Sequence, residues 1–398
     1  MARIYLDARN ITNAAAGVAR YARSLITEIV DQSPGDEFVI IRHRSNTRPL
    51  FADPPPSVQE IPVNYTIDGL QNMMFGHRAL QSAFARGGPP DLYHSLFHIL
   101  PMRTRAVLGD TPVVTTLHDF VWIDHPDASQ PSFVKARSIE AFARRAIPFA
   151  LRTSDRVIAI SEPTRRRARE YVDDDKMVTI GHGVDEAFFH SPGPPGSAFT
   201  ELMEPDRPCI AAIGNHKPYK NLGLLIDAFA HLIDTGFSAQ LVLIGDCEKL
   251  SNRIGDTTAS EWITVTGYVD DEMLRAILSQ ARIFCLPSKV EGFGLPLLEA
   301  MAMGLPTIIA NIEPLASIAG EAALRVEPND IDGLTLLLRR ILEDDRLADR
   351  LARRGKRRAG QFRWSTTAQR TIEVYRQLLH DDAVVGGSDL HVRDGAGR

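Results

Sequence analysis

Short apolar runs alternate with longer amphipathic stretches along the chain. In the first half the apolar runs predict strands at Arg3–Asp7, Phe38–Arg42, Asp91–His94, Pro112–Leu117, Arg156–Ile160 and Met177–Ile180. The amphipathic stretches between them predict helices near Val18–Val30, Leu70–Phe84, Phe133–Leu151 and Pro163–Tyr171.

A second series of the same kind follows. Its predicted strands are Cys209–Ile213, Gln240–Ile244, Ile263–Thr266, Arg282–Leu286, Pro306–Ala310 and Leu324–Val326. Its predicted helices lie near Leu222–Leu232, Asp271–Ser279, Leu295–Met303 and Ile331–Leu342. Strands that are apolar on both faces and separated by helices indicate parallel sheets covered on both sides. The pattern therefore predicts an α/β fold with two doubly wound, Rossmann-like domains facing each other across a cleft.

The length of 398 residues also favours two domains. Between the two series, residues 190–208 contain five prolines and two glycines, a composition typical of a linker. We therefore assign residues 1–190 to a first domain, 191–208 to the linker and 209–362 to a second domain. Residues 381–398 have little to bury and are predicted to form a disordered tail.

Charge and composition narrow the classes of function. The net charge of −5 gives no reason to expect a nucleic-acid partner. No apolar run reaches the roughly 18 residues that a membrane span needs, and no signal-peptide pattern precedes Arg3. The spacing of Cys209, Cys247 and Cys285 suits neither a metal site nor a disulfide framework, so we expect reduced, packed thiols in a cytoplasmic protein.

Glu299 is the one charged residue in the apolar run Leu295–Leu305. Pro296 is well placed as the first residue of a helix, and that helix is apolar nearly all round, which predicts that it is buried. A lone buried carboxylate is costly unless it is paired or meets a polar ligand. Two interpretations stay open from the residues alone: Glu299 accepts hydrogen bonds from a ribose diol, or it pairs with a buried Lys or Arg.

Glu291 lies in the loop that precedes this helix. Gly292 and Gly294 allow the backbone of the loop to approach a ligand closely, and the start of the helix favours an anion. The segment thus offers one carboxylate for hydroxyls, amides for phosphate and a second carboxylate for further hydroxyls. A nucleotide sugar has these three parts in that order.

The motifs resemble those of the family-four glycosyltransferases, which have the two-domain GT-B fold. Glu291 and Glu299 in "EGFGLPLLEAMAMGLP" resemble the E-x7-E signature of retaining members. In the second domain the similar segments are "AAIGNHKPYKNLGLLIDAF", "LVLIGD" and "TVTGYVDDEMLRAILSQARIFCLPS". In the first they are "GVARYARSL", "LYHS", "VVTTLHDF", "VIAISEPTRRRA" and "GHGVD". "FRWSTTAQRTIEVYRQLL" resembles the closing helix, so residues 364–380 are expected to cross back to the first domain.

The resemblance implies roles for residues of the second domain. Lys220 would place its charge on the donor diphosphate. Glu299 would hold the ribose, while Glu291 and the amides of Phe293, Gly294 and Leu295 would meet the diphosphate and the donor sugar. The base would rest near Gly267–Val269, with Val269 in contact with it.

The sequence departs from the family pattern at one position. Many members carry Arg directly after the glycine that corresponds to Gly214, whereas this chain has Asn215. Because Asn supplies hydrogen bonds without charge, stabilisation of the diphosphate must depend on Lys220, helped by Lys217.

His118 and Asp119 follow the strand Pro112–Leu117, at the end where a crevice opens. By resemblance His118 points toward the donor sugar and the acceptor. Asp119 either faces the acceptor, orients His118 or caps the next turn.

Three further residues of the first domain are candidates. The loop that ends at Gly17 resembles the family's loop that closes over the donor phosphate, with Arg20 nearby on the acceptor side. His94, at the end of its strand, is a candidate for the acceptor side. A structural role remains open for both Gly17 and His94.

The resemblance implies a retaining transfer of a hexose from a nucleotide diphosphate sugar to a hydroxyl of a glycan or lipid-linked acceptor. GDP-mannose is the first candidate donor, because the "GN-x-KP-x-KN" form resembles polysaccharide mannosyltransferases. No cofactor is expected. No required metal is expected either, because the run Asp173–Asp175 is interpreted as a surface turn.

Other interpretations remain open. A sugar-nucleotide epimerase of the same fold would act on the donor alone, and a non-catalytic binder of sugar nucleotides or glycans would form no product. A dinucleotide oxidoreductase is disfavoured, because neither first strand is followed by Gly-x-Gly-x-x-Gly.

Residues 133–170 hold ten Lys or Arg against four Asp or Glu. They form either a solvated helix face or a surface that contacts an anionic membrane. The second interpretation places the protein at the inner face of the cell membrane.

Overall fold

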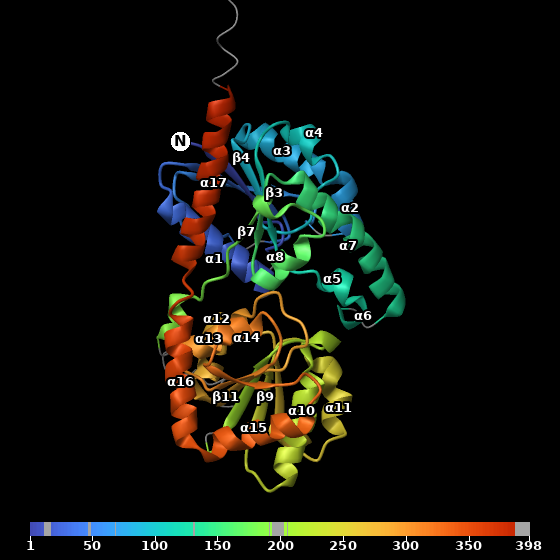
Figure 1. Ribbon diagram of the computed structural model, residues 1–398, viewed down its shortest axis with the longest axis vertical. Helices are drawn as coiled ribbons and strands as arrows, with labels where there is room; N and C mark the ends of the chain where they lie inside the picture. Colours follow the sequence, from blue (N-terminus) through green and yellow to red (C-terminus); the bar gives the residue numbers. More distant parts are fainter. Residues whose placement is uncertain are drawn as a thin grey trace, which may run out of the picture.

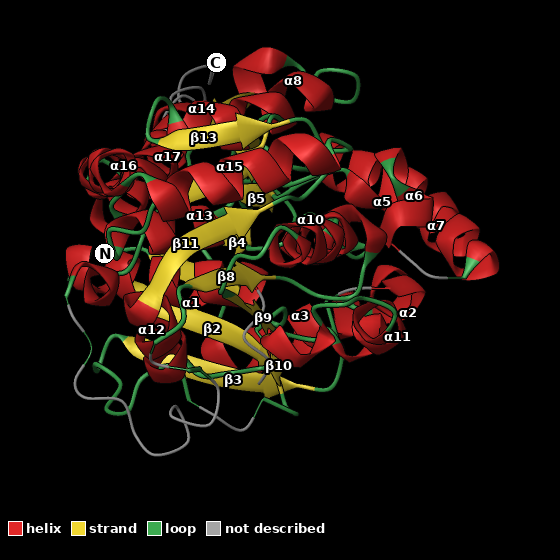
Figure 2. Cartoon of the chain, turned by 90° about the horizontal axis from the view of Figure 1, so that it is seen from below, coloured by secondary structure: helices red, strands yellow, loops and turns green. Residues whose placement is uncertain are grey.

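The computed structural model describes residues 1–11, 17–46, 49–67, 69–129, 132–190, 192, 203–204 and 206–386. Its strands form two sheets, one in each half of the chain, and every strand pairing within them is parallel. The first sheet has the order β3-β2-β1-β4-β5-β6-β7 and the second the order β10-β9-β8-β11-β12-β13. Helices lie on both sides of the strands (Figure 2). The predicted GT-B architecture of two Rossmann-like domains is confirmed (Figure 1).

The strands of the first sheet are β1 (Arg3–Asp7), β2 (Glu37–His43), β3 (Val58–Val63), β4 (Leu92–Ser95), β5 (Val113–Leu117), β6 (Arg156–Ala159) and β7 (Met177–Thr179). The second sheet consists of β8 (Cys209–Ile213), β9 (Gln240–Ile244), β10 (Ile263–Gly267), β11 (Ala281–Leu286), β12 (Thr307–Ala310) and β13 (Ala323–Val326).

The helices of the first domain are α1 (Gly17–Gln32), α2 (Gly69–Phe75), α3 (His77–Gly87), α4 (Thr104–Leu108), α5 (Val121–Asp124), α6 (Pro126–Ser129), α7 (Phe133–Thr153) and α8 (Glu162–Ala168). Those of the second half are α10 (Leu222–Asp234), α11 (Ser251–Gly255), α12 (Asp271–Gln280), α13 (Leu295–Ala302), α14 (Leu315–Ala319), α15 (Ile331–Glu343), α16 (Asp345–Ala359) and α17 (Trp364–Gly386).

Each sheet reverses its strand order once, between β1 and β4 in the first domain and between β8 and β11 in the second. At such a switch point the loops after neighbouring strands lead into helices on opposite faces, so a crevice opens between them. Asn215 follows β8 and Glu291 follows β11, while His118 follows β5 in the facing domain. The topology thus brings the predicted site residues to the cleft.

The last helix, α17, returns to the first domain and packs against α1 (Figure 1, red). On its buried side, the Tyr375 hydroxyl lies 2.6 Å from Nδ1 of His94. On its outer side, Arg376 forms an ion pair with Asp36. The chain also crosses between the domains near Val184, which forms a parallel bridge with Arg363. Both crossings therefore lie side by side at the base of the cleft.

Several elements differ from the sequence predictions, among them the short helices α4, α5, α6, α11 and α14, which were not predicted. The edge strand β3 was not predicted, because its polar residues and Pro62 conceal it. The single helix predicted at Leu70–Phe84 is two helices that meet at Gly76. The helix α16 was missed because it is dominated by charged residues.

The ends of the predicted segments fall partly outside the described residues. The helix α17 continues to Gly386, so the predicted tail begins as helix, and residues 387–398 are not described. Of the predicted linker, only residues 192, 203–204 and 206–208 are described. The three cysteines are buried and free, as expected for packed thiols.

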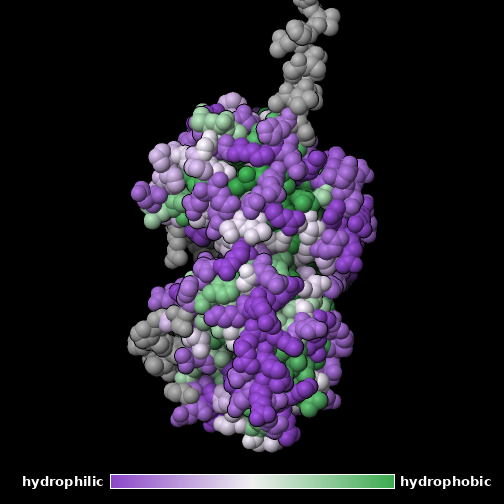
Figure 3. Space-filling model, turned by 60° about the vertical axis from the view of Figure 1, so that its left-hand side comes forward, coloured by the Kyte–Doolittle hydropathy of each residue, from purple (hydrophilic) through white to green (hydrophobic). Residues whose placement is uncertain are grey.

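Within the described residues, no helix combines the length and apolar character that crossing a bilayer would require. The face shown in Figure 3 is dominated by hydrophilic residues, with hydrophobic ones in smaller areas between them.

Candidate active site

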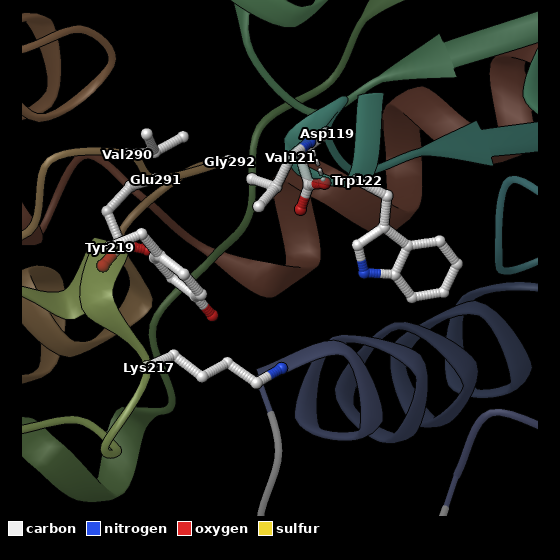
Figure 4. Close-up of a pocket in the computed structure, with 8 residues that line it drawn as sticks. All are labelled: Asp119, Val121, Trp122, Lys217, Tyr219, Val290, Glu291 and Gly292. Carbon is white, nitrogen blue, oxygen red and sulfur yellow. Dashed lines mark hydrogen bonds between the residues drawn. The ribbon is translucent and has the colours of Figure 1, made fainter. Parts of the chain in front are cut away.

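A cavity of about 600 Å³ lies between the two domains, within the size range of small-molecule sites. Its lining includes Gly17, Arg20, His118, Asn215, Lys217, Lys220, Val269, Glu291, Phe293, Gly294, Leu295 and Glu299. A smaller compartment of about 100 Å³ adjoins it and shares Asp119, Lys217 and Glu291 with it. Figure 4 shows the side chains of the first domain facing Lys217, Tyr219 and Glu291 of the second across this compartment. Of the predicted site residues, all but His94 line one space.

Lys220 and Glu291 form an ion pair of 2.7 Å on the wall of the second domain. Burial lowers the pKa of Lys220, but Glu291, Tyr219 and Asp119 together outweigh burial and raise it above its usual range. Lys220 therefore stays charged. Its backbone is held by the next residue, Asn221, which adopts a left-handed conformation (φ 55°) and donates from Nδ2 to the carbonyls of Pro287 and Pro328.

The loop between β11 and α13 is built for close approach. Gly294 has φ 112°, a conformation that favours glycine, and it directly precedes α13. A Cβ on Gly292 would lie 2.7 Å from the carbonyl oxygen of His118 in the other domain. The loop can therefore lie against the first domain only with glycine at this position. The amino end of α13 is thereby directed at the cavity, where it favours an anion.

Glu299 lines the cavity from the second turn of α13, and its side chain is 2% exposed. Its Oε1 accepts a hydrogen bond from Arg20, which reaches across the cleft from α1 and also pairs with Asp271. Its Oε2 is buried and has no hydrogen-bond partner within the described residues. Burial raises the pKa of Glu299, and Arg20 opposes that rise.

The interpretation that Glu299 pairs with an arginine is confirmed, and the interpretation that it binds a ribose stays a prediction. The carboxylate is paired with an arginine, yet it faces the cavity with one oxygen unsatisfied. Arg20 was predicted on the acceptor side. Its contacts place it instead beside the carboxylate predicted to hold the ribose.

The wall of the first domain carries His118 and Asp119, directly after β5. Nε2 of His118 donates a hydrogen bond of 2.9 Å to the carbonyl of Leu96, because a carbonyl oxygen can only accept. Burial lowers the pKa of His118 to about 4, so the ring is neutral. Asp119 accepts a hydrogen bond of 3.0 Å from the amide of Val121, so it caps the turn, as one of the predicted roles has it. It also lines the smaller compartment, and burial raises its pKa.

Asn215 and Lys217 occupy the turn after β8. The side-chain oxygen of Asn215 accepts a 3.0 Å hydrogen bond from the amide of Lys217, which fixes the turn. Burial and the nearby charge of Lys220 lower the pKa of Lys217. An anion between these two lysines would relieve their repulsion. The predicted closing loop before Gly17, residues 12–16, lies outside the described residues.

The prediction that His94 lines the acceptor side is not supported by its position. Its side chain is completely buried, and its two ring nitrogens contact the hydroxyls of Tyr375 and Thr116. His94 is therefore a core residue that ties α17 to the first sheet.

Sequence reasoning missed His182, Tyr219, Trp122 and Tyr268, which also line the cavity. The signal for His182 was present, since it lies in the quoted segment "GHGVD". The aromatic residues carried no comparable signal. In the described part of the chain, no group of His, Cys, Asp and Glu is arranged to hold a metal ion.

Two family descriptions match the chain side by side. "Glycosyltransferase Family 4" matches residues 15–188 and "Glycosyl transferases group 1" matches residues 198–358. Together with the fold and the site, they define the class: the chain belongs to the family-four glycosyltransferases.

Its relatives include mannosyltransferases. The chain is 36% identical over 171 residues to the O-antigen chain mannosyltransferase B of Escherichia coli, covering 42% of this chain and 45% of the relative. It is 26% identical over 330 residues to the phosphatidyl-myo-inositol mannosyltransferase of Mycolicibacterium smegmatis, covering 80% and 79%. The match to the first relative thus spans less than half of its length.

Solved structures share the fold. Sucrose-phosphate synthase from Thermosynechococcus elongatus superimposes with a TM-score of 0.77 at 20% identity, covering 96% of this chain and all of the other. The Anabaena protein HepE in complex with UDP-glucose superimposes with a TM-score of 0.67 at 16% identity, covering 95% of this chain and 100% of the other.

Proposed function

We propose that this protein transfers a hexose, with retention of configuration, from a nucleotide diphosphate sugar to a hydroxyl of a glycan or lipid-linked acceptor. The observation that carries the proposal is the arrangement along one wall of the cavity. Lys220, the amino end of α13 and Glu299 all line the cavity from the second domain. They offer a cation and amides to a diphosphate and a carboxylate oxygen to a ribose.

Mannose is the sugar we propose, with GDP-mannose as donor. The relatives named above are mannosyltransferases, and the segment that contains Asn215, Lys217 and Lys220 has the form that resembles such enzymes. A UDP-sugar is the alternative, since a protein of the same fold was solved with UDP-glucose.

In the proposed reaction the bond between the sugar C1 and the diphosphate oxygen breaks, and a bond from C1 to the acceptor oxygen forms on the same face. The acceptor proton passes to the leaving diphosphate. The charge that develops on the diphosphate is stabilised by Lys220, by Lys217 and by the amides before α13, because these groups are already in place. We propose no required metal ion for this step.

His118 and Asp119 face this reaction from the first domain. A neutral His118 does not compete with the lysines for the diphosphate, and its ring can contact the sugar. Asp119 lies close enough to Glu291 and Lys220 for their charges to influence its pKa: Glu291 raises it and Lys220 lowers it.

The test is a transfer assay with purified protein. GDP-mannose, UDP-glucose and dTDP-glucose are first compared by thermal shift, because a ligand that binds the folded state raises the melting temperature. The donor with the largest shift is then incubated with glycan acceptors. A glycoside with the anomeric configuration of the donor supports the proposal, and an inverted product contradicts it. Conversion of the donor without an acceptor would indicate an epimerase, and binding without any product a non-catalytic binder.

We further propose that the first domain contacts an anionic membrane. The surface is less basic than its composition indicates, because Arg137 and Arg144 share Glu140 while Arg165 and Arg169 share Asp174. Exposed Phe133 and Val134 at the start of α7 offer an apolar contribution. Flotation with anionic and neutral vesicles tests the contact, and equal absence of binding to both would refute it.

A further inference from the structure

Within the described residues, the imidazole of His182 has no hydrogen-bond partner, although it lies in the cavity between the domains. Its residue is 5% exposed, it lines the cavity, and both ring nitrogens are buried without a partner within the described residues. His94, the buried histidine of the first sheet, has partners on both nitrogens. A buried polar group without a partner is costly, so His182 calls for an explanation.

Aromatic rings surround this imidazole. The distances between ring centroids are 4.7 Å to Tyr21, 4.6 Å to Phe293 and 5.7 Å to Trp364. Tyr21 belongs to the first domain, Phe293 to the loop of the second domain, and Trp364 is the first residue of α17. The imidazole of His182 therefore lies at the contact between the two domains.

The chemistry of His182 fits a neutral ligand. Burial lowers the pKa of His182 well below its usual value, so the ring is neutral, with one N–H donor and one nitrogen acceptor. A neutral ring has little attraction for a diphosphate. A sugar hydroxyl both donates and accepts, and the surrounding aromatic rings can pack against the C–H faces of a sugar.

The position favours the sugar of the donor over other ligands. Phe293 directly precedes Gly294 and α13, whose amino end we propose as the binding site of the diphosphate. The ring centroid of His118 lies 6.1 Å from that of His182. The hexose of a nucleotide sugar is attached directly to the diphosphate, so it must lie next to this loop.

We propose that His182 binds a hydroxyl of the hexose carried by the donor. This inference rests on the proposed function and extends it. The imidazole recognises the sugar and not the nucleotide, so it contributes to the choice of the hexose.

The experiment compares two ligands on two proteins. The affinities of the nucleotide sugar with the largest thermal shift and of its parent nucleoside diphosphate are measured by calorimetry for wild type and His182→Phe. Phenylalanine keeps the aromatic packing and removes both nitrogens. We expect the ratio of the two affinities to fall by about 10-fold in the variant, as for the loss of one or two hydrogen bonds, with diphosphate affinity unchanged.

Trp364→Phe is the matched control, because it alters the packing around the imidazole but leaves both nitrogens in place, and it should keep the wild-type ratio. If His182→Phe does not fold, His182→Leu is measured in the same way. An unchanged ratio, or an equal loss of both affinities, overturns the inference. Failure of the proposed function has a different signature, namely absence of a glycoside product from the wild-type protein.

Discussion

The two walls of the cleft differ in charge: one carries an ion pair, and the other carries neutral histidines. On the wall of the second domain, Lys220 and Glu291 form an ion pair, and Lys217 lies beside them. On the wall of the first domain, His118 and His182 are held neutral by burial. This difference indicates which wall would stabilise each part of a donor. A diphosphate requires fixed positive charge, whereas a sugar requires neutral donors and acceptors that do not attract the diphosphate.

Arg20 is an exception to this division. It belongs to the first domain, but its guanidinium reaches the carboxylates of Glu299 and Asp271 in the second. Because this ion pair joins the two domains, a ligand that binds Glu299 would also affect how the two walls are held together. Substitutions on either wall, or at Arg20, test this difference between the two walls.

The largest expected effect follows from Lys220→Ala. Turnover should fall by roughly 100-fold or more, because one preorganised group that stabilises the leaving diphosphate is lost. Steady-state kinetics measures the effect. Lys289→Ala is the control, since Lys289 is an exposed lysine on the neighbouring loop between β11 and α13.

Removing Lys220 also leaves Glu291 without its partner, so stability must be checked separately. The double variant Lys220→Met with Glu291→Gln removes both charges and should fold better than Lys220→Ala. If either variant folds and turns over at the wild-type rate, the assignment of charge to this wall is wrong.

The neutral wall can be tested through acid unfolding. Burial lowers the pKa of His98 to about 3 and that of His118 to about 4, whereas an unfolded histidine titrates near 6.5. Their contribution to stability is therefore fully present above pH 6.5 and is lost as the pH falls toward these folded values. Each such histidine should add about 1.4 kcal/mol per pH unit to the slope of the unfolding free energy.

Urea unfolding between pH 7 and pH 4.5 measures that slope. His98→Asn should reduce the slope of the unfolding free energy by about 1.4 kcal/mol per pH unit, which corresponds to one proton. His190→Asn serves as the control, because the side chain of His190 is 71% exposed. An unchanged slope in His98→Asn would mean that His98, which lies behind this wall and accepts a hydrogen bond from the amide of His118, is not held neutral.

Arg20→Ala tests the contact between the walls. Nucleotide affinity should weaken by about 10-fold, because the buried carboxylate of Glu299 loses the guanidinium that opposes the rise of its pKa. Since only the ionised carboxylate accepts two hydroxyl hydrogen bonds, affinity should also fall further in the variant as the pH is lowered from 8 to 6.

Calorimetry at both pH values measures this effect, and Arg20→Lys should restore most of the affinity. Arg23→Ala, on the same helix, is the control. A variant that binds more tightly than wild type would instead show that Arg20 competes with the ribose for Glu299.

Much of the fold followed from local pattern. The strands β1, β8 and β9 have the predicted bounds, because each is an apolar run with clear ends. The helix α16 was missed although Leu347, Leu351 and Gly355 form a buried stripe at a spacing of four residues. That stripe is narrow and surrounded by arginine and lysine, so composition concealed a regular pattern.

The candidate site was predictable where residues follow one another along the chain, as Glu291 and Glu299 do. Contacts between distant segments were not. The approach of Arg20 to Glu299 joins residues 279 positions apart, and the identity of either residue gives no indication of it. The burial of His94 was also out of reach, because it depends on Tyr375 in the returning helix.

The smallest expected effect concerns Asn215, the position at which the sequence departs from the pattern that it resembles. Asn215→Arg adds a charge to the wall of the second domain but removes the hydrogen bond that fixes the amide of Lys217. It also places a third cation beside Lys217 and Lys220, where burial and the charge of Lys220 already lower the pKa of Lys217. These effects oppose one another, so affinity for the nucleoside diphosphate should change by less than about 3-fold, with a steeper dependence on salt. Asn215→Ala separates them, because it removes the hydrogen bond without adding charge. A gain of about 10-fold in Asn215→Arg, equivalent to ~1.4 kcal/mol, would show that the charged wall lacks a cation and that Lys217 does not supply it.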